Sequence, residues 1–398
     1  MITLEDIKKA ARTLDGIIHK TQFLYTSTLS QLTGGSIYLK TENLQKTGSF
    51  KVRGAYYKIA SLTDGERSKG VVAVSAGNHA QGVAFAASRF GIKSIIVMPE
   101  FAPVAKIVAT MNYGAEVILH GKNIDQAKEK ALELALKGMT LIHPYDDPYV
   151  IAGQGTIGIE MLEDNSALET IIVPVGGGGL VSGIAIAAKS IKPGVKIIGV
   201  EVEGYDSLKI SLDEGKRVCV PGRLTLADGI AVGICGDIPF GVIKEKVDEI
   251  VVVSDDDISS AMFWLLERAK YVVEGAGAAG LAAILAKKIG LAGNKVGVVL
   301  SGGNIDLSML QLIIDKGLVK EGRRVEVRVI VPDKPGQLKG ILELLGNLGV
   351  NIYSINHNRV SEGLTSGFAE VELILETRNR DHAANVISTI QENGYILR

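Results

Sequence analysis

The stretch Val173-Pro174-Val175-Gly176-Gly177-Gly178-Gly179-Leu180 says more about the fold than any other part of the sequence. An apolar run that leads directly into glycines is typical of a buried strand followed by a tight turn and a helix. Four consecutive glycines cost conformational entropy, so they indicate a backbone that a ligand approaches closely. Because free N–H groups at a helix start bind anions, a phosphate is the expected ligand.

Two nucleotide-binding motifs offer other interpretations of this turn. The lysine and hydroxyl residue of a P-loop are missing, which excludes that motif. A dinucleotide site is harder to exclude, because Gly183 follows Gly177-x-Gly179 and Glu201 ends the next apolar run. The glycine spacing departs from G-x-G-x-x-G, so a nicotinamide-dependent oxidoreductase is kept only as an alternative of a different class.

Short apolar runs like the one before the glycines recur along most of the chain, with helix-period segments between them. Single helices between buried runs predict an α/β fold with parallel sheets covered on both faces. In such folds ligands bind beyond the carboxyl ends of the strands. The runs are Val71–Ser75, Ser94–Met98, Glu116–His120, Thr170–Val175, Lys196–Glu201, Glu249–Ser254 and Val296–Ser301, and the helical segments include Ala80–Phe90, Ile124–Lys137 and Asp257–Lys270.

The composition changes after Lys316-Gly317, where the charged stretch Lys320–Arg324 begins. The remaining segment, about 75 residues from Arg324, is long enough to fold as a unit. Its pattern predicts the βαββαβ order of a ferredoxin-like domain. The expected elements are strand Val325–Val331, helix Gln337–Leu348, strands Val350–Arg359 and Phe368–Glu376, helix Asp381–Glu392 and strand Tyr395–Arg398.

The bulk composition favours a small-molecule ligand. The 398 residues carry a formal net charge of −1, which provides no field for recruiting nucleic acid or an anionic membrane. The longest apolar run, Ala276 to Ala286, is too short to cross a bilayer. Cys219 and Cys235 are too few for a disulfide scaffold or a thiolate metal cluster. A soluble, cytoplasmic protein is expected.

A lysine that could act as a nucleophile lies in Thr47-Gly48-Ser49-Phe50-Lys51-Val52-Arg53-Gly54. Lys51 stands between an aromatic and an apolar residue, where partial desolvation would lower its pKa and supply a free amine for Schiff-base chemistry. Taken alone, an ordinary solvated lysine is the favoured interpretation. Lys46, Arg53 and Lys58 are expected to be solvated.

Two more strand-end turns carry polar residues. In Val74-Ser75-Ala76-Gly77-Asn78-His79-Ala80-Gln81-Gly82, the helix start could bind an anion, or Asn78 could simply cap the helix. The turn Val299-Leu300-Ser301-Gly302-Gly303-Asn304 could be an ordinary tight connection. Neither turn identifies a function by itself.

Taken together and in this order, the four segments resemble the fold-type II pyridoxal-phosphate enzymes, and among them the threonine dehydratases, also called threonine ammonia-lyases. The resemblance implies a tryptophan synthase β-like architecture of two parallel-sheet α/β domains over residues 1–320. The smaller subdomain would span about 50–145 and the larger one the flanking segments. Residues 321–398 resemble an ACT domain, a small regulatory module.

The resemblance also implies residue roles. Lys51 would hold pyridoxal 5′-phosphate covalently and move the Cα proton. The cofactor would further contact Phe50, Asn78 at its 3′-oxygen and Ser301 at its ring nitrogen. Backbone N–H groups of Gly176, Gly177, Gly178, Gly179 and Leu180 would bind its phosphate. The substrate carboxylate would lie against Ser75, Gly77, Asn78 and His79.

These roles lead to a hypothesis of β-elimination. A neutral hydroxyl from Ser301 cannot stabilise a pyridinium as a carboxylate would, so loss of a β-substituent becomes the easier outcome. The expected reaction converts L-threonine to 2-oxobutanoate and ammonia, and also L-serine to pyruvate and ammonia. Because no side-chain acid is evident, the cofactor phosphate is expected to protonate the leaving hydroxyl.

Related activities stay open as alternatives. Serine racemases of this family carry a second serine where this chain has Ala76, and alanine has no proton to donate; this favours an ammonia-lyase. An ammonia-lyase or racemase that prefers serine or 3-hydroxyaspartate is the runner-up. Glu201 matches the racemases' metal site, but Ser207 stands where an aspartate is expected, with Asp206 one place early. No metal is expected.

The C-terminal module suggests regulation. Asp333-Lys334-Pro335-Gly336-Gln337-Leu338 forms a turn and helix start suited to an amino-acid effector. A purely structural or oligomerising role is about equally compatible with the sequence. Modules of this kind commonly pair across subunits, so a homodimer or homotetramer is expected.

Overall fold

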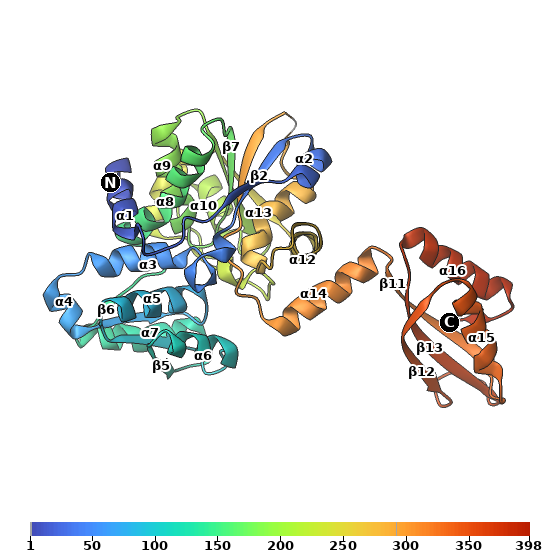
Figure 1. The fold of residues 1–398 in the computed structure, drawn as a ribbon. Helices are drawn as coiled ribbons and strands as arrows, with labels where there is room; N and C mark the ends of the chain where they lie inside the picture. The colour runs from blue at the N-terminus through green and yellow to red at the C-terminus, as the bar shows by residue number, and fades with distance from the viewer. Residues whose placement is uncertain (1, 292) are drawn as a thin grey trace. The chain divides into compact units, whose positions relative to one another are not determined.

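The computed structural model describes residues 2–291 and 293–398. The chain divides into two compact units, Met1–Asp306 and Leu307–Arg398 (Figure 1). The division lies before helix α14 (Leu307–Lys320), whereas the sequence placed the change at residues 320 and 321. Among the described residues, no helix is both long and apolar enough to cross a membrane.

The first unit is an alternating α/β structure. Its helices are α1 (Leu4–Leu14), α2 (Ser27–Thr33), α3 (Lys51–Ala60), α4 (Asp64–Lys69), α5 (Asn78–Arg89), α6 (Val104–Asn112), α7 (Ile124–Leu136), α8 (Pro148–Asp164), α9 (Gly179–Ile191), α10 (Ser207–Glu214), α11 (Asp237–Lys246), α12 (Asp255–Trp264) and α13 (Gly275–Leu285). Short helical turns are η1 (Glu42–Leu44), η2 (Lys46–Gly48), η3 (Asp228–Ile230) and η4 (Leu265–Ala269). Its strands are β1 (Phe23–Tyr25), β2 (Ser36–Lys40), β3 (Val71–Val74), β4 (Ser94–Met98), β5 (Glu116–Leu119), β6 (Thr140–Leu141), β7 (Thr170–Pro174), β8 (Lys196–Val202), β9 (Glu249–Val253) and β10 (Lys295–Val299).

The smaller sheet is parallel and has the strand order β5-β4-β3-β6. Val71 and Ala73 of β3 pack in one core with α5, while Val72 packs with α7 on the other face. Successive side chains of a strand point to opposite faces, so a continuous apolar run fits a sheet covered on both sides.

The larger sheet has the order β1-β2-β10-β7-β8-β9, in which β1 is antiparallel and the other strands are parallel. Ile171 and Val173 of β7 share a core with α8 and α9. On the opposite face α13 approaches closely, since a Cβ built on Gly280 would lie 3.0 Å from Val298. The predicted α/β class with parallel sheets is confirmed.

Three details differ from the sequence expectation. Strand β2, which pairs with β10 inside the larger sheet, was not predicted. Helix α5 begins at Asn78 rather than Ala80. The expected helix Asp257–Lys270 is split into α12 and the wider turn η4, which Lys270 follows with φ +62°. These positions depend on tertiary pairing and local backbone geometry, which periodicity does not report.

The second unit has the predicted βαββαβ order after α14. Its elements are β11 (Arg324–Pro332), α15 (Gln337–Asn347), β12 (Asn351–Asn358), β13 (Phe368–Glu376), α16 (Arg380–Glu392) and β14 (Ile396–Leu397). The strands form an antiparallel sheet in the order β12-β13-β11-β14. Alternate residues of β11, such as Val327 and Val329, join Ile341 of α15 and Ile390 of α16 in one core. The predicted ferredoxin-like order is confirmed.

Candidate active site

Lys51 is the first residue of α3 and its amine is partly enclosed. Nζ donates a hydrogen bond to the carbonyl oxygen of Pro144 at 3.0 Å and lies 5.2 Å from the centroid of the Phe50 ring. Burial lowers the pKa of Lys51 to about 8, against the opposing effect of the negative charge of Glu274. A far larger fraction of this amine is therefore unprotonated near neutral pH than in an ordinary lysine.

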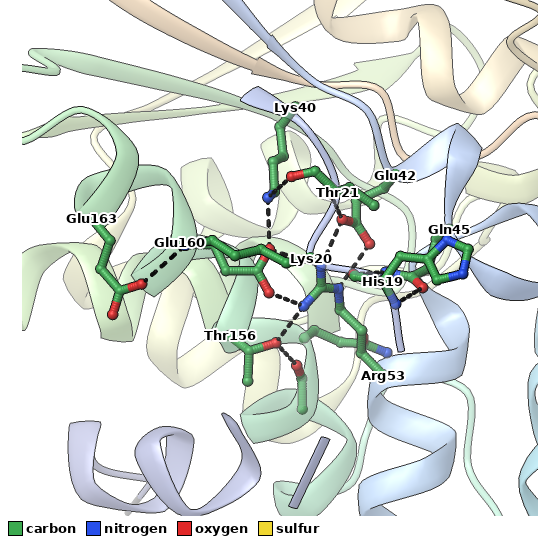
Figure 2. Close-up of polar contacts among 12 residues, drawn as sticks. His19, Lys20, Thr21, Lys40, Glu42, Gln45, Arg53, Thr156, Glu160 and Glu163 are labelled. Atoms are coloured by element: carbon green, nitrogen blue, oxygen red, sulfur yellow. Dashed lines mark hydrogen bonds and ion pairs between the residues drawn. The ribbon is translucent and has the colours of Figure 1, made fainter. Parts of the chain in front are cut away.

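The far side of α3 is held by a buried ion network made of Lys40, Glu42, Arg53 and Glu160 (Figure 2). Arg53 donates to both carboxylate oxygens of Glu42 at 2.8 Å and to Glu160 at 2.6 and 2.9 Å. Lys40 donates to Glu160 at 2.6 Å. The two cations and two anions balance, and bidentate guanidinium contacts fix the geometry. Arg53 was expected to be solvated; that expectation is wrong.

Residues 47–50 and the turn after β10 run alongside each other. Ser49 and Gly302 form a β-bridge, Phe50 N donates to Ser301 O at 3.1 Å, and Gly303 N donates to Gly48 O at 2.9 Å. Ser301 is only 3% exposed. The structure therefore brings Ser301 next to Phe50, the residue before Lys51.

The amide of Asn78 connects the second turn to this pair. Because Gly77 occupies the N-cap position and no side chain caps α5, Asn78 does not serve as the helix cap. Its Nδ2 donates to Glu274 at 2.6 Å, and its Oδ1 accepts from Asn304 Nδ2 at 2.7 Å. Asn304 also donates to Thr47 O at 2.7 Å. Asn78 is thus tied to two segments more than 190 residues away in sequence.

In the same turn, the Ser75 hydroxyl binds the local backbone, whereas the His79 ring is buried away from the turn. Gly77 N donates to the Ser75 hydroxyl at 3.1 Å. The His79 ring is buried, with Nε2 2.8 Å from Ile142 O, and burial lowers its pKa to about 3. The neutral ring is therefore committed to a carbonyl oxygen. What His79 can offer a ligand is its backbone N–H in the first turn of α5.

The glycine turn lies at the start of α9, as the sequence predicted. Gly178 has φ +90°, and no side chain caps the helix. A Cβ at Gly177 would lie 2.3 Å from the Tyr145 ring, and one at Gly179 would lie 2.8 Å from Tyr145 O. Only glycine fits this backbone, and the N–H groups of the uncapped first turn, including that of Leu180, suit an anionic group.

Gly183 and Glu201, the two residues that suggested a dinucleotide site, have other structural roles. Gly183 lies inside α9 against α8, where a Cβ would be 2.3 Å from Ile151 O. The buried Glu201 carboxylate accepts from Leu208 N and Lys209 N, both at 2.9 Å, at the start of α10. Gly183 therefore serves helix packing, and Glu201 serves the α10 terminus rather than a ribose.

Metal ligands are not gathered in the part of the chain that the structure describes. There, no group of three or more His, Cys, Asp or Glu side chains is placed to hold an ion. Ser207 donates to Val232 O at 3.4 Å, and Asp206 occupies the position before α10.

Two parts of the site were missed by the sequence analysis. The connection from His143 to Asp146 supplies the carbonyl at Lys51 and the Tyr145 ring against the glycine turn. Glu274 places a buried carboxyl beside Asn78, although no side-chain acid had been evident. The available signal was a single acid immediately before the apolar run of α13.

The arrangement fits a phosphorylated cofactor that attaches to an amine. Hydrogen bonds connect the segment of the desolvated lysine to the buried serine and, through Asn304, to the amide of Asn78. The uncapped glycine turn packs against Tyr145, next to the Pro144 carbonyl that binds Lys51. Two buried hydroxyl oxygens beside Lys51, Thr47 Oγ1 and Ser49 Oγ, have no hydrogen-bond partner among the described residues. Buried polar groups are usually paired, so these oxygens are consistent with a polar ligand at this position.

Comparisons with known proteins agree with this fit. The sequence profile described as "Pyridoxal-phosphate dependent enzyme" matches residues 14–302, and the profile "ACT domain" matches residues 320–398. A Thermotoga maritima protein named L-threonine ammonia-lyase is 53% identical, over 100% of this chain and 99% of its own length.

Solved structures are similar to the first unit. Threonine deaminase isoform 2 from Solanum lycopersicum has a TM-score of 0.74 and 38% identity, covering 78% of this chain and 91% of that one. Maize serine racemase has a TM-score of 0.76 and 37% identity, covering 80% and 98%. The neighbours thus include both a threonine deaminase and a serine racemase.

Proposed function

The chain belongs to the family of pyridoxal-phosphate dependent enzymes, and from that premise we propose that it is an ammonia-lyase acting on L-threonine. The products are 2-oxobutanoate and ammonia, and L-serine gives pyruvate and ammonia. Water lost across the Cα–Cβ bond is regained on hydrolysis, so the overall conversion is balanced without another reactant. The full-length similarity to an L-threonine ammonia-lyase supports this assignment.

The observation that carries the proposal is the position of the Lys51 amine. It is desolvated, and it donates to the carbonyl oxygen of Pro144, whose neighbour Tyr145 packs against the glycine turn. When bound, pyridoxal phosphate supplies an electron-withdrawing ring that acidifies the Cα–H of an attached amino acid. Lys51 would hold this group and, once free, would remove the Cα proton as an amine base.

The surrounding residues would orient the cofactor and the substrate. Gly176, Gly177, Gly178, Gly179 and Leu180 would bind a phosphate through backbone N–H groups. Phe50 would pack near the ring, Asn78 would donate to its 3′-oxygen and Ser301 would meet its nitrogen. Ser75, Gly77, Asn78 and His79 would receive the substrate carboxylate, with His79 acting through its backbone N–H.

Two residues favour elimination over competing reactions. Ser301 offers a neutral hydroxyl, so it cannot stabilise positive charge on a ring nitrogen, and negative charge left at Cα is better relieved by loss of the β-hydroxyl. Ala76, partly buried in the turn after β3, offers no proton for the opposite face of Cα. A racemase similar to the maize enzyme is therefore the second candidate.

Residues 320–398 match the ACT domain profile, and we propose that this unit is regulatory and binds an amino-acid effector at the turn before α15. Gly336 has φ +90°, no side chain caps α15, and Asp333 lies 3.1 Å from Arg359. An uncapped helix start suits a carboxylate, while Asp333 suits an ammonium group.

A homodimer or homotetramer is also part of the proposal. β12 is an edge strand on which Tyr353 and Ile355 are exposed, and such edges favour pairing with another chain. Light scattering on the purified protein would give the mass, and a monomer would contradict this part. Free thiols at Cys219 and Cys235 are consistent with a cytoplasmic location.

Product analysis tests the activity. The wild-type protein and Lys51→Ala are each incubated with pyridoxal phosphate and L-threonine, L-serine or 3-hydroxyaspartate, and 2-oxo acid, ammonia and D-amino acid are measured. Wild type should release 2-oxobutanoate and ammonia in equal amounts from L-threonine, and Lys51→Ala should release none. Poor turnover of threonine beside rapid turnover of another substrate, or dominant D-serine, would overturn the threonine assignment.

A further inference from the structure

Glu274 is placed to cap α13 but does not do so. It occupies the N-cap position, and its side chain makes no cap hydrogen bond to the helix. Instead its Oε1 accepts from Asn78 Nδ2 at 2.6 Å, and its backbone N donates to Gly302 O at 3.1 Å. The residue is 6% exposed. The described contact of this buried carboxyl is therefore with Asn78 and not with the helix that follows it.

Two backbone segments close around this carboxyl. A Cβ on Gly302 would lie 2.2 Å from Glu274 Oε1, and a Cβ on Gly229 of η3 would lie 3.5 Å from the same atom. Gly302 directly follows Ser301, so the carboxyl borders the turn proposed to meet the cofactor ring. Glu274 is therefore part of the active site and not of a separate cluster.

The orientation of the Asn78 amide follows from its partners. Oδ1 accepts from Asn304, and one N–H of Nδ2 donates to Glu274. An amide nitrogen carries two N–H groups, so one is left to donate to an acceptor in the site. Asn304, whose Nδ2 is also bonded to Thr47 O, and Glu274 together fix the amide in the orientation that leaves this N–H for the site.

We propose that Glu274 is a positioning residue of the active site, which keeps an N–H of Asn78 directed at the cofactor oxygen and tunes that donor through its own proton. The inference rests on the function proposed above, because Asn78 is the residue assigned to the 3′-oxygen. A negative carboxylate bonded to one N–H enriches the amide nitrogen and weakens the other N–H as a donor. A neutral carboxyl strengthens it.

The charged groups around Glu274 allow both proton states near neutral pH. Burial and, to a smaller extent, the charge of Asp228 raise the pKa of Glu274 to about 7, against the opposing effects of the Asn78 hydrogen bond, Lys106 and Lys51. Lys106 and Asp228 are themselves paired at 2.8 Å. The neutral form, with the stronger Asn78 donor, therefore predominates below about pH 7.

The test compares the holoenzyme of wild type and Glu274→Gln across about pH 5.5 to 8.5. The visible absorption band of the bound cofactor and the pH profile of kcat should both change with a midpoint near pH 7 in wild type. Glutamine keeps the acceptor for Asn78 but cannot titrate, so both midpoints should disappear. Wild-type behaviour of Glu274→Gln in both measurements would overturn the inference.

Glu201→Gln is the matched control. Burial also raises the pKa of Glu201 to about 7, but its carboxylate binds Leu208 N and Lys209 N at α10. The midpoints of band and kcat should persist in this variant. Their loss would assign the effect to charge in general and overturn a specific role of Glu274.

A third measurement is independent of the loaded enzyme. A carboxyl whose pKa is raised by folding stabilises the apoprotein at low pH and loses this contribution as the pH rises to its folded value. The unfolding free energy of wild type should therefore fall relative to Glu274→Gln between about pH 4.5 and 7. A pH-independent difference would contradict titration of Glu274. If wild type itself binds no cofactor and forms no 2-oxo acid, the proposed function fails instead.

Discussion

At the scale of single residues, Lys51 is set apart by what its amine contacts. Lys58 Nζ pairs with Asp147 at 2.8 Å, whereas Lys51 Nζ meets the Pro144 carbonyl oxygen. A carbonyl oxygen accepts the hydrogen bond of the amine but lacks the negative charge of a carboxylate, which would stabilise the protonated form. Burial then dominates and lowers the pKa of Lys51 to about 8.

The lowered pKa predicts how cofactor attachment depends on pH. Only the unprotonated amine attacks, so the rate of covalent attachment to the apoprotein should rise about tenfold per pH unit below pH 8 and level off above it. Stopped-flow absorbance after mixing apoprotein with pyridoxal phosphate measures this rate. A rate that still climbs steeply above about pH 9.5 would indicate an ordinary lysine.

Ala76 provides a gain-of-function prediction. A serine at this position would place a hydroxyl in the turn after β3, where it could donate a proton to the face of Cα opposite the amine base. Because positioned proton transfer contributes about 100-fold or more, D-serine formation by Ala76→Ser should exceed the wild-type background by about 100-fold. Chiral chromatography of the serine pool measures it. Ala60→Ser is the control, because Ala60 is the last residue of α3, at the end opposite Lys51. This variant should form no more D-serine than wild type. Equal D-serine formation by both variants would refute the role of position 76.

At the scale of elements, α3 carries Lys51 on one side and the buried ion network on the other. Arg53→Met would leave Glu42 and Glu160 facing Lys40 alone, with an uncompensated buried charge. The cost should be about 3–5 kcal/mol of unfolding free energy, measured by denaturant titration. Lys93→Met is the control: its pair with Glu116 is exposed, so removal should cost about 1 kcal/mol or less. Equal costs would show that burial of the network does not matter.

The glycine turn makes a second prediction at this scale. In Gly177→Ala the methyl group would collide with the Tyr145 ring and displace the backbone that precedes α9. Affinity for pyridoxal phosphate should fall at least about tenfold, as measured by titration of the visible band. Gly241→Ala in α11, where a Cβ meets nothing within 4 Å, should bind normally. Unchanged affinity in Gly177→Ala would remove the turn from the cofactor site.

The strand-end turns could be predicted from sequence because each combines an apolar run with adjacent small residues. The roles of Arg53 and Glu274 could not. Arg53 meets Glu160 across 107 residues, and Asn78 meets Glu274 across 196. Such pairs form only after the sheets are assembled, and a single arginine or glutamate looks like any solvated charge. Their burial is a tertiary property that no local pattern carries.

At the scale of the whole molecule, we expect a ligand that binds the C-terminal unit to change the activity of the first unit. Isoleucine or valine, which have no β-hydroxyl to eliminate, should change kcat and raise the melting temperature of the full chain, because a ligand that binds only the folded state stabilises it. Scanning fluorimetry and initial rates measure both effects. If isoleucine, valine, threonine and serine all leave stability and activity unchanged, the effector proposal fails.

If Lys51 holds the cofactor, reducing the linkage makes it permanent, and the modified residue can then be identified. The wild-type holoenzyme is reduced with borohydride, digested and analysed by mass spectrometry. The account predicts one modified lysine, Lys51, with the visible band lost on reduction. Modification of another lysine, such as Lys46 or Lys58, or of none, would contradict it.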